Sequence, residues 1–510
     1  MSRTKNVTIN LMTSAGTYAV STVLAFVYRT FFIRELGAVY LGVQGLFTSI
    51  LSLLSLVELG VGSALTFSMY EPLAKNDQVK TKQLLRFYEK AYRIIAIIVL
   101  GIGACFLPFL DFFVKERPNI SESLEFIYIL YVLNSALSYI CIYKQSILQA
   151  DQKGFVVALF NSLFQVIRTI LQIVSLFIFK SFILTLLIQI VCTFAGNLTI
   201  FKYAEHKYPY IKNLKNSGRL EEKEQNTIID KVKALFLYKI GAYIVNGTDS
   251  ILISKFVGVV ENGLYSNYLM LITVVKTLFE YGCHALTPSL GNKQALAREE
   301  SGESKEEDFL TLLFIHFWFL SIITACFVGF IKPFIMIWAG TEYVLDELTA
   351  AFLALNMYMF CMRRVFISYR NAFGLFVYAR YKPIAEALIN LVASLLLQIK
   401  FGLAGIVIGT TVGELLTSFW IEPHVLYKHH FKIKSYKYWR SFTVYTLLTI
   451  VYAILTKTVS SHLSINSWYM LVLFAGAAAI ILFIINFLIF RKTKEEKAAI
   501  SRVIFLLKRI

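Results

Sequence analysis

The stretch that decides the fold runs from residue 249 to residue 287 and reads DSILISKFVGVVENGLYSNYLMLITVVKTLFEYGCHALT. It resembles residues 28–66, which read YRTFFIRELGAVYLGVQGLFTSILSLLSLVELGVGSALT. In each stretch the chain leaves an apolar segment through a short turn marked by glycine and enters another apolar segment. Such paired apolar segments predict two membrane helices joined by a tight connection.

The glycines set the register between the two copies. Gly37 and Gly42 recur as Gly258 and Gly263 at one constant spacing, and Ala-Leu-Thr at 64–66 recurs at 285–287 at the same spacing. Glu58-Leu59-Gly60 corresponds to Glu280-Tyr281-Gly282 with a displacement of one residue. We therefore predict a duplicated bundle of membrane helices, which is a frequent plan for transporters with a site between the halves.

Composition places the chain among polytopic membrane proteins. Of its 510 residues, 57% are hydrophobic and 16% are charged, and the apolar residues form long runs between brief charged loops. The basic start, with Arg3 and Lys5, leads directly into an apolar segment too long for a cleavable signal peptide. The first helix is therefore expected to be retained.

The net charge of +18 does not indicate nucleic-acid binding, because its distribution follows membrane topology. Counted over alternate loops, about three dozen Lys and Arg fall on one side and about eight on the other, as the positive-inside rule requires. Both termini are then cytoplasmic, and the basic loops face anionic membrane lipids. The six cysteines lie apart in apolar segments and are interpreted as small hydrophobic residues.

Apolar runs long enough to cross the bilayer number about fourteen, so the predicted fold is an all-α integral membrane protein. Two pseudo-repeated six-helix lobes are followed by two further transmembrane helices. The predicted divisions are a first lobe at 1–204, a cytoplasmic linker at 205–233, a second lobe at 234–427, a basic cytoplasmic loop at 428–440, the two additional helices at 441–490 and a basic cytoplasmic tail at 491–510.

Charged and polar groups inside apolar segments mark the candidate site, because a charge at membrane depth costs at least about 3 kcal/mol unless it faces a cavity or a partner. In the fifth segment such residues recur on one helical face, with Arg168 near the middle: Asn161, Gln165, Arg168, Gln172 and Ser175. One interpretation is an aqueous cavity in which the guanidinium binds a phosphate or carboxylate. The other is an interhelical polar seam with Arg168 paired to Glu58, Glu280 or Glu414.

A second interior face is predicted on the seventh segment, where Lys239, Tyr243, Asn246 and Asp249 follow similar spacing. Asp249 is a candidate for binding a coupling proton or sodium ion, and a structural ion pair with a nearby base is the more frequent role of such an acid. Arg29 is the further cationic candidate, although its place within about a turn of the outer boundary favours snorkelling.

Three glutamates are also candidates for ion coupling: Glu58, Glu280 and Glu414. Lys276 precedes Glu280 by four residues, so these two side chains are expected to neutralise each other. A group of cations crowds the cytoplasmic side of the tenth and eleventh segments, where it either guides an anionic substrate or merely follows topology: Arg363, Arg364, Arg370, Arg380 and Lys382.

Motifs of chemistry are missing from the sequence. It has no G-x-x-x-x-G-K-[ST], no H-E-x-x-H and no G-x-S-x-G, and its seven histidines have no metal-ligand spacing. We expect no enzyme activity, no catalytic residue, no metal and no cofactor. The predicted outer loops are too short for an external catalytic domain.

Several stretches carry a family resemblance: FIRELGAVYLG at 32–42, TDSILISKFVG at 248–258, ENGLYSNY at 261–268, PSLG at 288–291, RNAFGL at 370–375 and GLAGIVIGT at 402–410. Here the chain resembles Wzx-type polysaccharide transporters of the multidrug/oligosaccharidyl-lipid/polysaccharide (MOP) exporter superfamily. Ala38 departs from the proline that many relatives have at that place.

The resemblance implies a central cationic cavity that opens alternately to each side of the bacterial cytoplasmic membrane. It implies a flippase for undecaprenyl-diphosphate-linked oligosaccharide repeat units, with membrane lipids and the glycan polymerase and glycosyltransferases of the same pathway as partners. A lipid II flippase and an ion-coupled multidrug exporter share this fold and remain alternatives. A scaffold protein and a membrane-embedded enzyme of glycan assembly, which belong to a different functional class, also remain alternatives.

Overall fold

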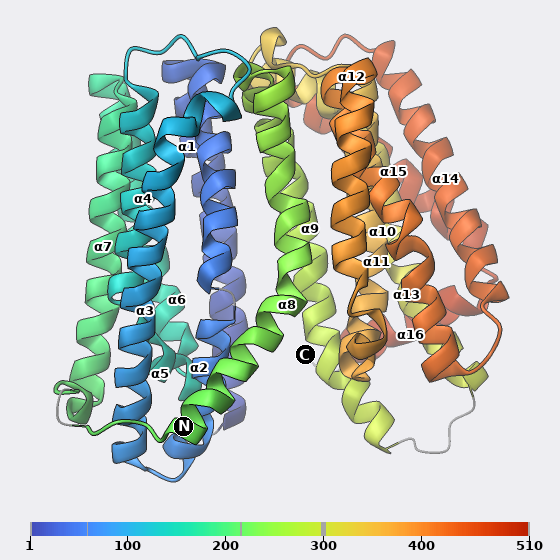
Figure 1. Ribbon diagram of the computed structural model, residues 1–510. Coiled ribbons are helices and arrows are strands. Elements are labelled where there is room, and N and C mark those ends of the chain that lie inside the picture. Colours follow the sequence, from blue (N-terminus) through green and yellow to red (C-terminus); the bar gives the residue numbers. More distant parts are fainter. Residues whose placement is uncertain (1–2, 59, 215–216, 297–301, 508–510) are drawn as a thin grey trace. The chain divides into compact units, whose positions relative to one another are not determined.

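The computed structural model describes residues 3–58, 60–214, 217–296 and 302–507, except for the side chains at 3–12, 14–15, 234, 237–246, 284–289, 291–296, 302, 376–377 and 502–507. The described residues form helices and contain no β-strand, which confirms the predicted all-α class. The α-helices of the described residues are α1 Arg3–Leu54, α2 Val61–Ala74, α3 Gln78–Phe106, α4 Leu124–Ile140, α5 Gln145–Ala150, α6 Gly154–Phe179, α7 Phe182–Lys207, α8 Glu222–Leu252, α9 Val259–Leu296, α10 Gly302–Trp338, α11 Glu347–Ala372, α12 Lys382–Leu416, α13 Ser418–Leu426, α14 Tyr436–Ser461, α15 Trp468–Phe490 and α16 Lys494–Leu507 (Figure 1).

Nine helical stretches of the described chain are long and apolar enough to cross a membrane, and the bent pair α4 and α5 would make a tenth. The protein is thus a multi-pass membrane protein. Two of the nine stretches turn back on themselves, because each contains a glycine outside the helical region: Gly37 in α1 (φ 80°) and Gly402 in α12 (φ 54°). The predicted number of fourteen spans stays a prediction.

Side-chain contacts prove the reversal at each glycine. Arg29 donates a hydrogen bond to Gln44 across Gly37, and Asn390 donates one to Thr410 across Gly402. In one straight helix the spacing of fifteen positions from Arg29 to Gln44 would separate them by about 22 Å. Each glycine therefore sits at the turn of a helical hairpin.

The duplicated glycines have a packing role in the first part of the chain. A Cβ on Gly42 would lie 1.7 Å from the carbonyl oxygen of Val259, and one on Gly263 would lie 2.2 Å from that of Ala38. The Asn262 amide donates to the Gly42 carbonyl at 3.0 Å. The two copies of the repeat thus touch through backbone that only glycine permits.

The later glycine of the repeat, Gly60 in the first copy and Gly282 in the second, has a different backbone conformation in each copy. Gly60 has φ of 90° and precedes α2, so the helical path is broken there. Gly282 lies inside the continuous helix α9. The sequence correspondence of these two glycines is therefore not matched by a common backbone conformation.

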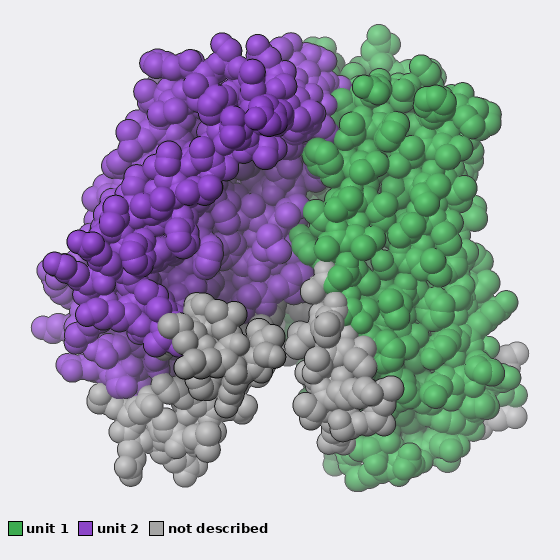
Figure 2. Space-filling view, turned by 180° about the vertical axis from the view of Figure 1, so that it is seen from behind, with its two compact units in different colours: residues 1–263 green, residues 264–510 purple. Residues whose placement is uncertain are grey.

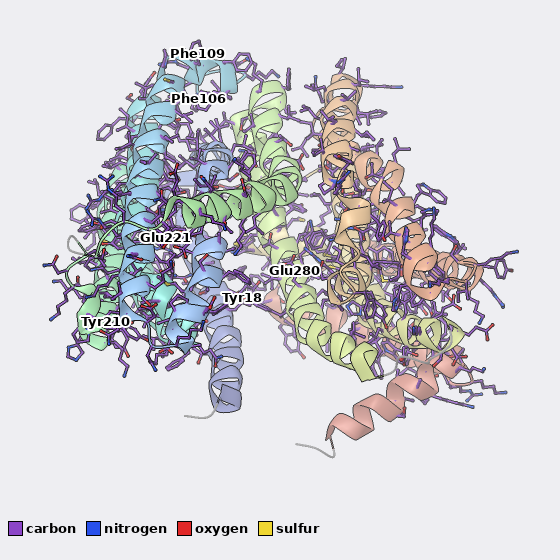
Figure 3. The ribbon with its side chains drawn as sticks, turned by 60° about the horizontal axis from the view of Figure 1, so that its bottom comes forward. Tyr18, Phe106, Phe109, Tyr210, Glu221 and Glu280 are labelled. Atoms are coloured by element: carbon purple, nitrogen blue, oxygen red, sulfur yellow. The ribbon has the colours of Figure 1, made fainter. Side chains whose placement is uncertain are left out.

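The chain divides into two compact units, residues 1–263 and 264–510, which Figure 2 colours separately. The predicted lobes have their linker at 205–233, and α8 begins at Glu222 within that range. Around that linker, where Figure 3 labels Tyr210 and Glu221, several apolar side chains join the hydrophobic core of the first unit: Ile211, Leu214, Leu220 and Ile228. The predicted linker is thus largely packed structure.

Candidate functional site

The polar stripe on α6 divides into a half that is open to its surroundings and a half that is tied into the protein. Asn161 is exposed. Gln165 accepts a hydrogen bond from the Ser21 hydroxyl of α1 at 2.7 Å. Gln172 is buried, and its amide donates to the Thr185 carbonyl of α7 at 2.9 Å. Gln165 and Gln172 therefore serve interhelical contacts, whereas Asn161 leaves the stripe accessible at its start.

Arg168 lies between these two halves and is half-buried. Its guanidinium is near enough to the Tyr28 hydroxyl and the Cys192 thiol to interact electrostatically with both. No acidic residue of the described chain forms an ion pair with it, whereas Glu280 and Glu414 pair with other arginines. The described contacts thus include interhelical hydrogen bonds on the α6 stripe but no ion pair of Arg168 with Glu58, Glu280 or Glu414.

Arg29 belongs to the same region of the first unit. Its Nη1 donates to Gln44 Oε1 at 3.4 Å, and its charge also interacts with Tyr28 and Tyr131. The turn at Gly37 brings Gln44 beside the half-buried guanidinium, and the expected snorkelling stays a prediction. Tyr28 thus has two cations near it, Arg29 and Arg168.

The predicted interior face of the seventh segment lies on α8. The side chains of Lys239, Tyr243 and Asn246 fall outside the described residues. Asp249, one turn before the end of α8 at Leu252, is half-buried. Glu58, in the short helical segment Ser55–Glu58, accepts a hydrogen bond from the Tyr92 hydroxyl at 3.5 Å.

The second unit contains a buried ionic network that couples α11, α12 and α13. Arg363 Nη1 lies 2.9 Å from Glu386 Oε1 and 3.2 Å from Glu414 Oε1. Lys382 Nζ lies 2.6 Å from Glu422 Oε1, and Arg370 Nη1 lies 3.6 Å from the same oxygen. Three cations thus face three carboxylates, and the network is formally neutral.

The network changes the interpretation of the crowded cations. Arg363, Arg370 and Lys382 are held by carboxylates, so they are not a free track for an anionic substrate. Glu386 and Glu422 are not among the residues that the sequence pattern predicted for the site. The spacing of Lys382 and Glu386, and that of Ser418 and Glu422, carries the helical i, i+4 signal that could have found them.

Glu280, labelled in Figure 3, also pairs differently from the expectation. It forms an ion pair with Arg364 of α11. The Lys276 ammonium lies over the Phe360 ring, 4.5 Å from its centroid, and the Arg364 guanidinium lies over the same ring at 4.1 Å. Arg364 is thus a partner of Glu280 that the sequence did not predict, and the neutralisation of Glu280 by Lys276 stays a prediction.

These features define a class of protein: an all-helical, multi-pass membrane protein with a cationic interior region in its first unit and no metal-ligand cluster among its described residues. The sequence profile of the family described as "Polysaccharide biosynthesis protein" matches residues 4–290. The chain belongs to that family. No curated protein sequence is significantly similar to it.

Solved structures show which fold this family member has. A lipid II flippase, MurJ, in an inward closed conformation superposes with a TM-score of 0.69 at 13% identity, over 94% of this chain and 99% of that one. An inward-facing MATE multidrug transporter of the MOP superfamily gives 0.62 at 13% identity, over 80% and 96%. A MOP transporter from Pyrococcus furiosus gives 0.51 at 12% identity, over 84% and 96%.

The comparisons confirm the predicted resemblance to Wzx-type proteins of the MOP superfamily. At these identities the superpositions concern the fold alone. The chain is thus a member of the polysaccharide biosynthesis family with a fold like that of MurJ and the MATE transporters.

Proposed function

We propose that this protein is a flippase that moves undecaprenyl-diphosphate-linked oligosaccharide repeat units from the cytoplasmic to the outer leaflet of the bacterial cytoplasmic membrane. The observation that carries the proposal is Arg168: a half-buried cation on a membrane helix, close to Tyr28 and without an ion-pair partner in the described chain. The family match supports a role in surface polysaccharide assembly.

The chemistry of the cargo explains why such a cation is useful. A diphosphate that crosses the hydrocarbon core needs compensation of its charge, and a guanidinium provides paired, charge-assisted hydrogen bonds to phosphate oxygens. Arg29 supplies a second positive charge near the same tyrosine. The prenyl chain stays in the bilayer while the head group passes, by alternating access, through the cationic cavity.

Glycosyltransferases would supply this substrate on the cytoplasmic side, and a glycan polymerase would consume it outside. Both termini would then be cytoplasmic. Among the proposed coupling acids, Glu280 and Glu414 belong to the second unit, where each forms an ion pair with an arginine. Asp249 lies on α8 in the first unit, which also contains Arg168, and we assign it to the coupling ion.

The decisive experiment measures leaflet access in vesicles reconstituted with the protein. A polyprenyl-diphosphate oligosaccharide is placed in the inner leaflet, and an impermeant glycosidase outside reports its arrival in the outer leaflet. We expect faster exposure than in protein-free vesicles, and a further increase under an ion gradient. No exposure with several glycan donors, in protein shown to be folded, would refute the proposal.

Lipid II is the second candidate cargo, because the MurJ structure named for it superposes over nearly the whole chain. It carries a diphosphate as well, so the cationic region does not separate the two. The same vesicles should therefore be loaded with lipid II in a parallel arm. Transport of lipid II alone would replace the oligosaccharide as substrate, and transport of lipophilic cations alone would indicate a multidrug exporter.

A further inference from the structure

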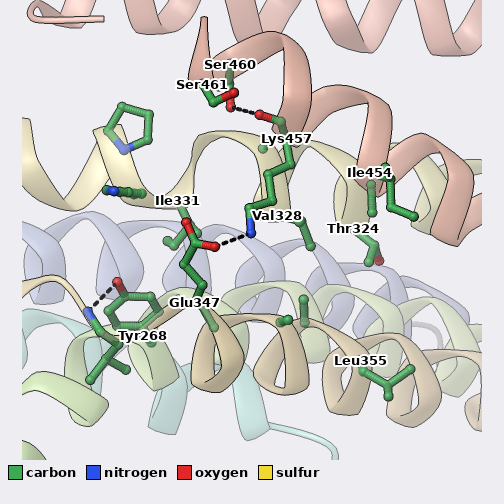
Figure 4. Close-up of a pocket in the computed structure, with 18 of the residues that line it drawn as sticks. Tyr268, Thr324, Val328, Ile331, Glu347, Leu355, Ile454, Lys457, Ser460 and Ser461 are labelled. Carbon is green, nitrogen blue, oxygen red and sulfur yellow. Dashed lines mark hydrogen bonds and ion pairs between the residues drawn. The ribbon is translucent and has the colours of Figure 1, made fainter.

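The second unit contains a cavity of about 730 Å³ bounded by α10, α11, α14 and the connection from α14 to α15 (Figure 4). Its volume falls within the range of small-molecule sites, roughly 300–1,000 Å³. None of the ionic network lines it, and none of the residues assigned above to the cargo does. Its function is thus a separate question.

The walls of the cavity are mostly apolar. Met336 of α10 and Ile454 of α14 line it and are 41% and 59% exposed, so they present apolar surface rather than filling the space. Hydroxyl groups further in bond within the protein: Tyr358 pairs with Thr446, and Thr449 donates to the Tyr445 carbonyl. The cavity therefore suits a hydrocarbon chain.

The length of the cavity matches one leaflet. Along α10 its lining runs from Thr324 to Met336, which corresponds to about 18 Å of helix. Half of a hydrocarbon core of roughly 30 Å is about 15 Å. An acyl chain of a phospholipid has this length, whereas an undecaprenyl chain is far longer than one leaflet is thick.

The positively charged side chains that line the cavity lie at its rim. Lys457 of α14 forms an ion pair with Glu347 of α11 at 2.6 Å, as Figure 4 shows, and Lys332 of α10 is exposed nearby. The carboxylate of Asp346 is occupied by the backbone N–H and hydroxyl of Thr349. The charged lining residues therefore sum to one positive charge at the polar end of the apolar groove.

We propose that this cavity binds one phospholipid with an anionic head group from the leaflet at this end of the helices. The phosphate sits at Lys332 and Lys457, and one acyl chain lies along α10 towards Thr324. With the termini cytoplasmic, as in the proposed function, this leaflet is the outer one. The binding itself does not depend on the cargo.

Native mass spectrometry of the purified full-length protein tests this, with phosphatidylglycerol and phosphatidylcholine as probes in equal amounts. We expect one tightly retained phosphatidylglycerol, preferred several-fold over phosphatidylcholine. Lys332→Gln and Lys457→Gln should each reduce that preference, whereas Glu347→Gln, which removes the negative charge of the rim, should increase it. Lys400→Gln, an exposed lysine outside the cavity in the same unit, should leave it unchanged.

A second variant tests the groove itself. Ala351→Phe places a ring in the cavity from an exposed lining position and should abolish retention of the lipid, whereas Ala477→Phe on the exposed face of α15 should not. Both proteins should elute as single species. Equal retention of the two lipids, unchanged retention in Ala351→Phe, or displacement of phosphatidylglycerol by undecaprenyl phosphate would each overturn the proposal. None of these readouts requires transport, so failure here leaves the flippase proposal intact.

Discussion

The two units bury charges in membrane helices in opposite ways. In the second unit, Arg363 lies among three carboxylates that also hold Arg370 and Lys382. In the first unit, Arg168 is near Tyr28 and Cys192 and has no described ion pair. A neutral network stabilises the fold only while all its members are present, because removal of one leaves a buried charge without a partner. A guanidinium without an ion pair can instead bind an anionic ligand. The difference separates structural charge from functional charge.

The largest effect is expected from Arg363→Ala. It leaves Glu386 and Glu414 buried without their guanidinium, and such a loss costs about 3–5 kcal/mol. The thermal midpoint of the detergent-solubilised protein should fall steeply. Adding Glu386→Gln and Glu414→Gln should recover part of the loss, because neutral amides need no counter-ion. A midpoint equal to wild type would contradict the structural role of the network.

Arg168→Ala should instead leave the thermal midpoint near that of wild type and strongly slow transport. Loss of a hydrogen-bonded charge costs about 1.5–3 kcal/mol in binding, which is roughly a 10- to 150-fold fall in rate if it acts in the transition state. The glycosidase assay measures the rate, and Arg168→Lys should retain part of it. Arg86→Ala, an arginine of α3 that contacts the Gly218 carbonyl, is the matched control. Normal transport by Arg168→Ala would contradict a role of this arginine in transport.

Asp249→Asn and Glu414→Gln compare the two units directly. We expect Asp249→Asn to remove the several-fold increase in flipping under an ion gradient while basal exchange continues. Glu414→Gln should keep the gradient response, because Arg363 retains Glu386. The measurement is the ratio of rates with and without the gradient. The reverse pattern would move the coupling site into the network of the second unit.

The smallest effect is expected from Gln172→Ala. It removes one buried hydrogen bond to the Thr185 carbonyl, worth about 1 kcal/mol, and should lower the thermal midpoint slightly. The flipping rate of the remaining folded protein should stay near wild type. A loss of transport as large as that of Arg168→Ala would place Gln172 in the cavity after all.

Local sequence patterns predicted the helical class and the glycine turn at Gly37. They could not assign partners to the charges. Lys276 and Glu280 are neighbours on one helix face, yet Glu280 pairs with Arg364, which is 84 residues away in the sequence. The sequence located Arg29 only by its depth in the membrane segment, whereas the turn at Gly37 gives it Gln44 as a neighbour. Spacing along a helix reports which residues share a face, but not which helix lies opposite.

The sequence by itself determined the membrane class and the family resemblance, because apolar run lengths and short sequence motifs are local properties of the chain. Only the tertiary structure decided which charges are compensated. Ion pairing depends on distances of a few ångströms between helices, and the packing that sets those distances joins residues far apart in the sequence. The network around Arg363, the contrasting surroundings of Arg168 and the cavity beside Lys332 all arise at that level.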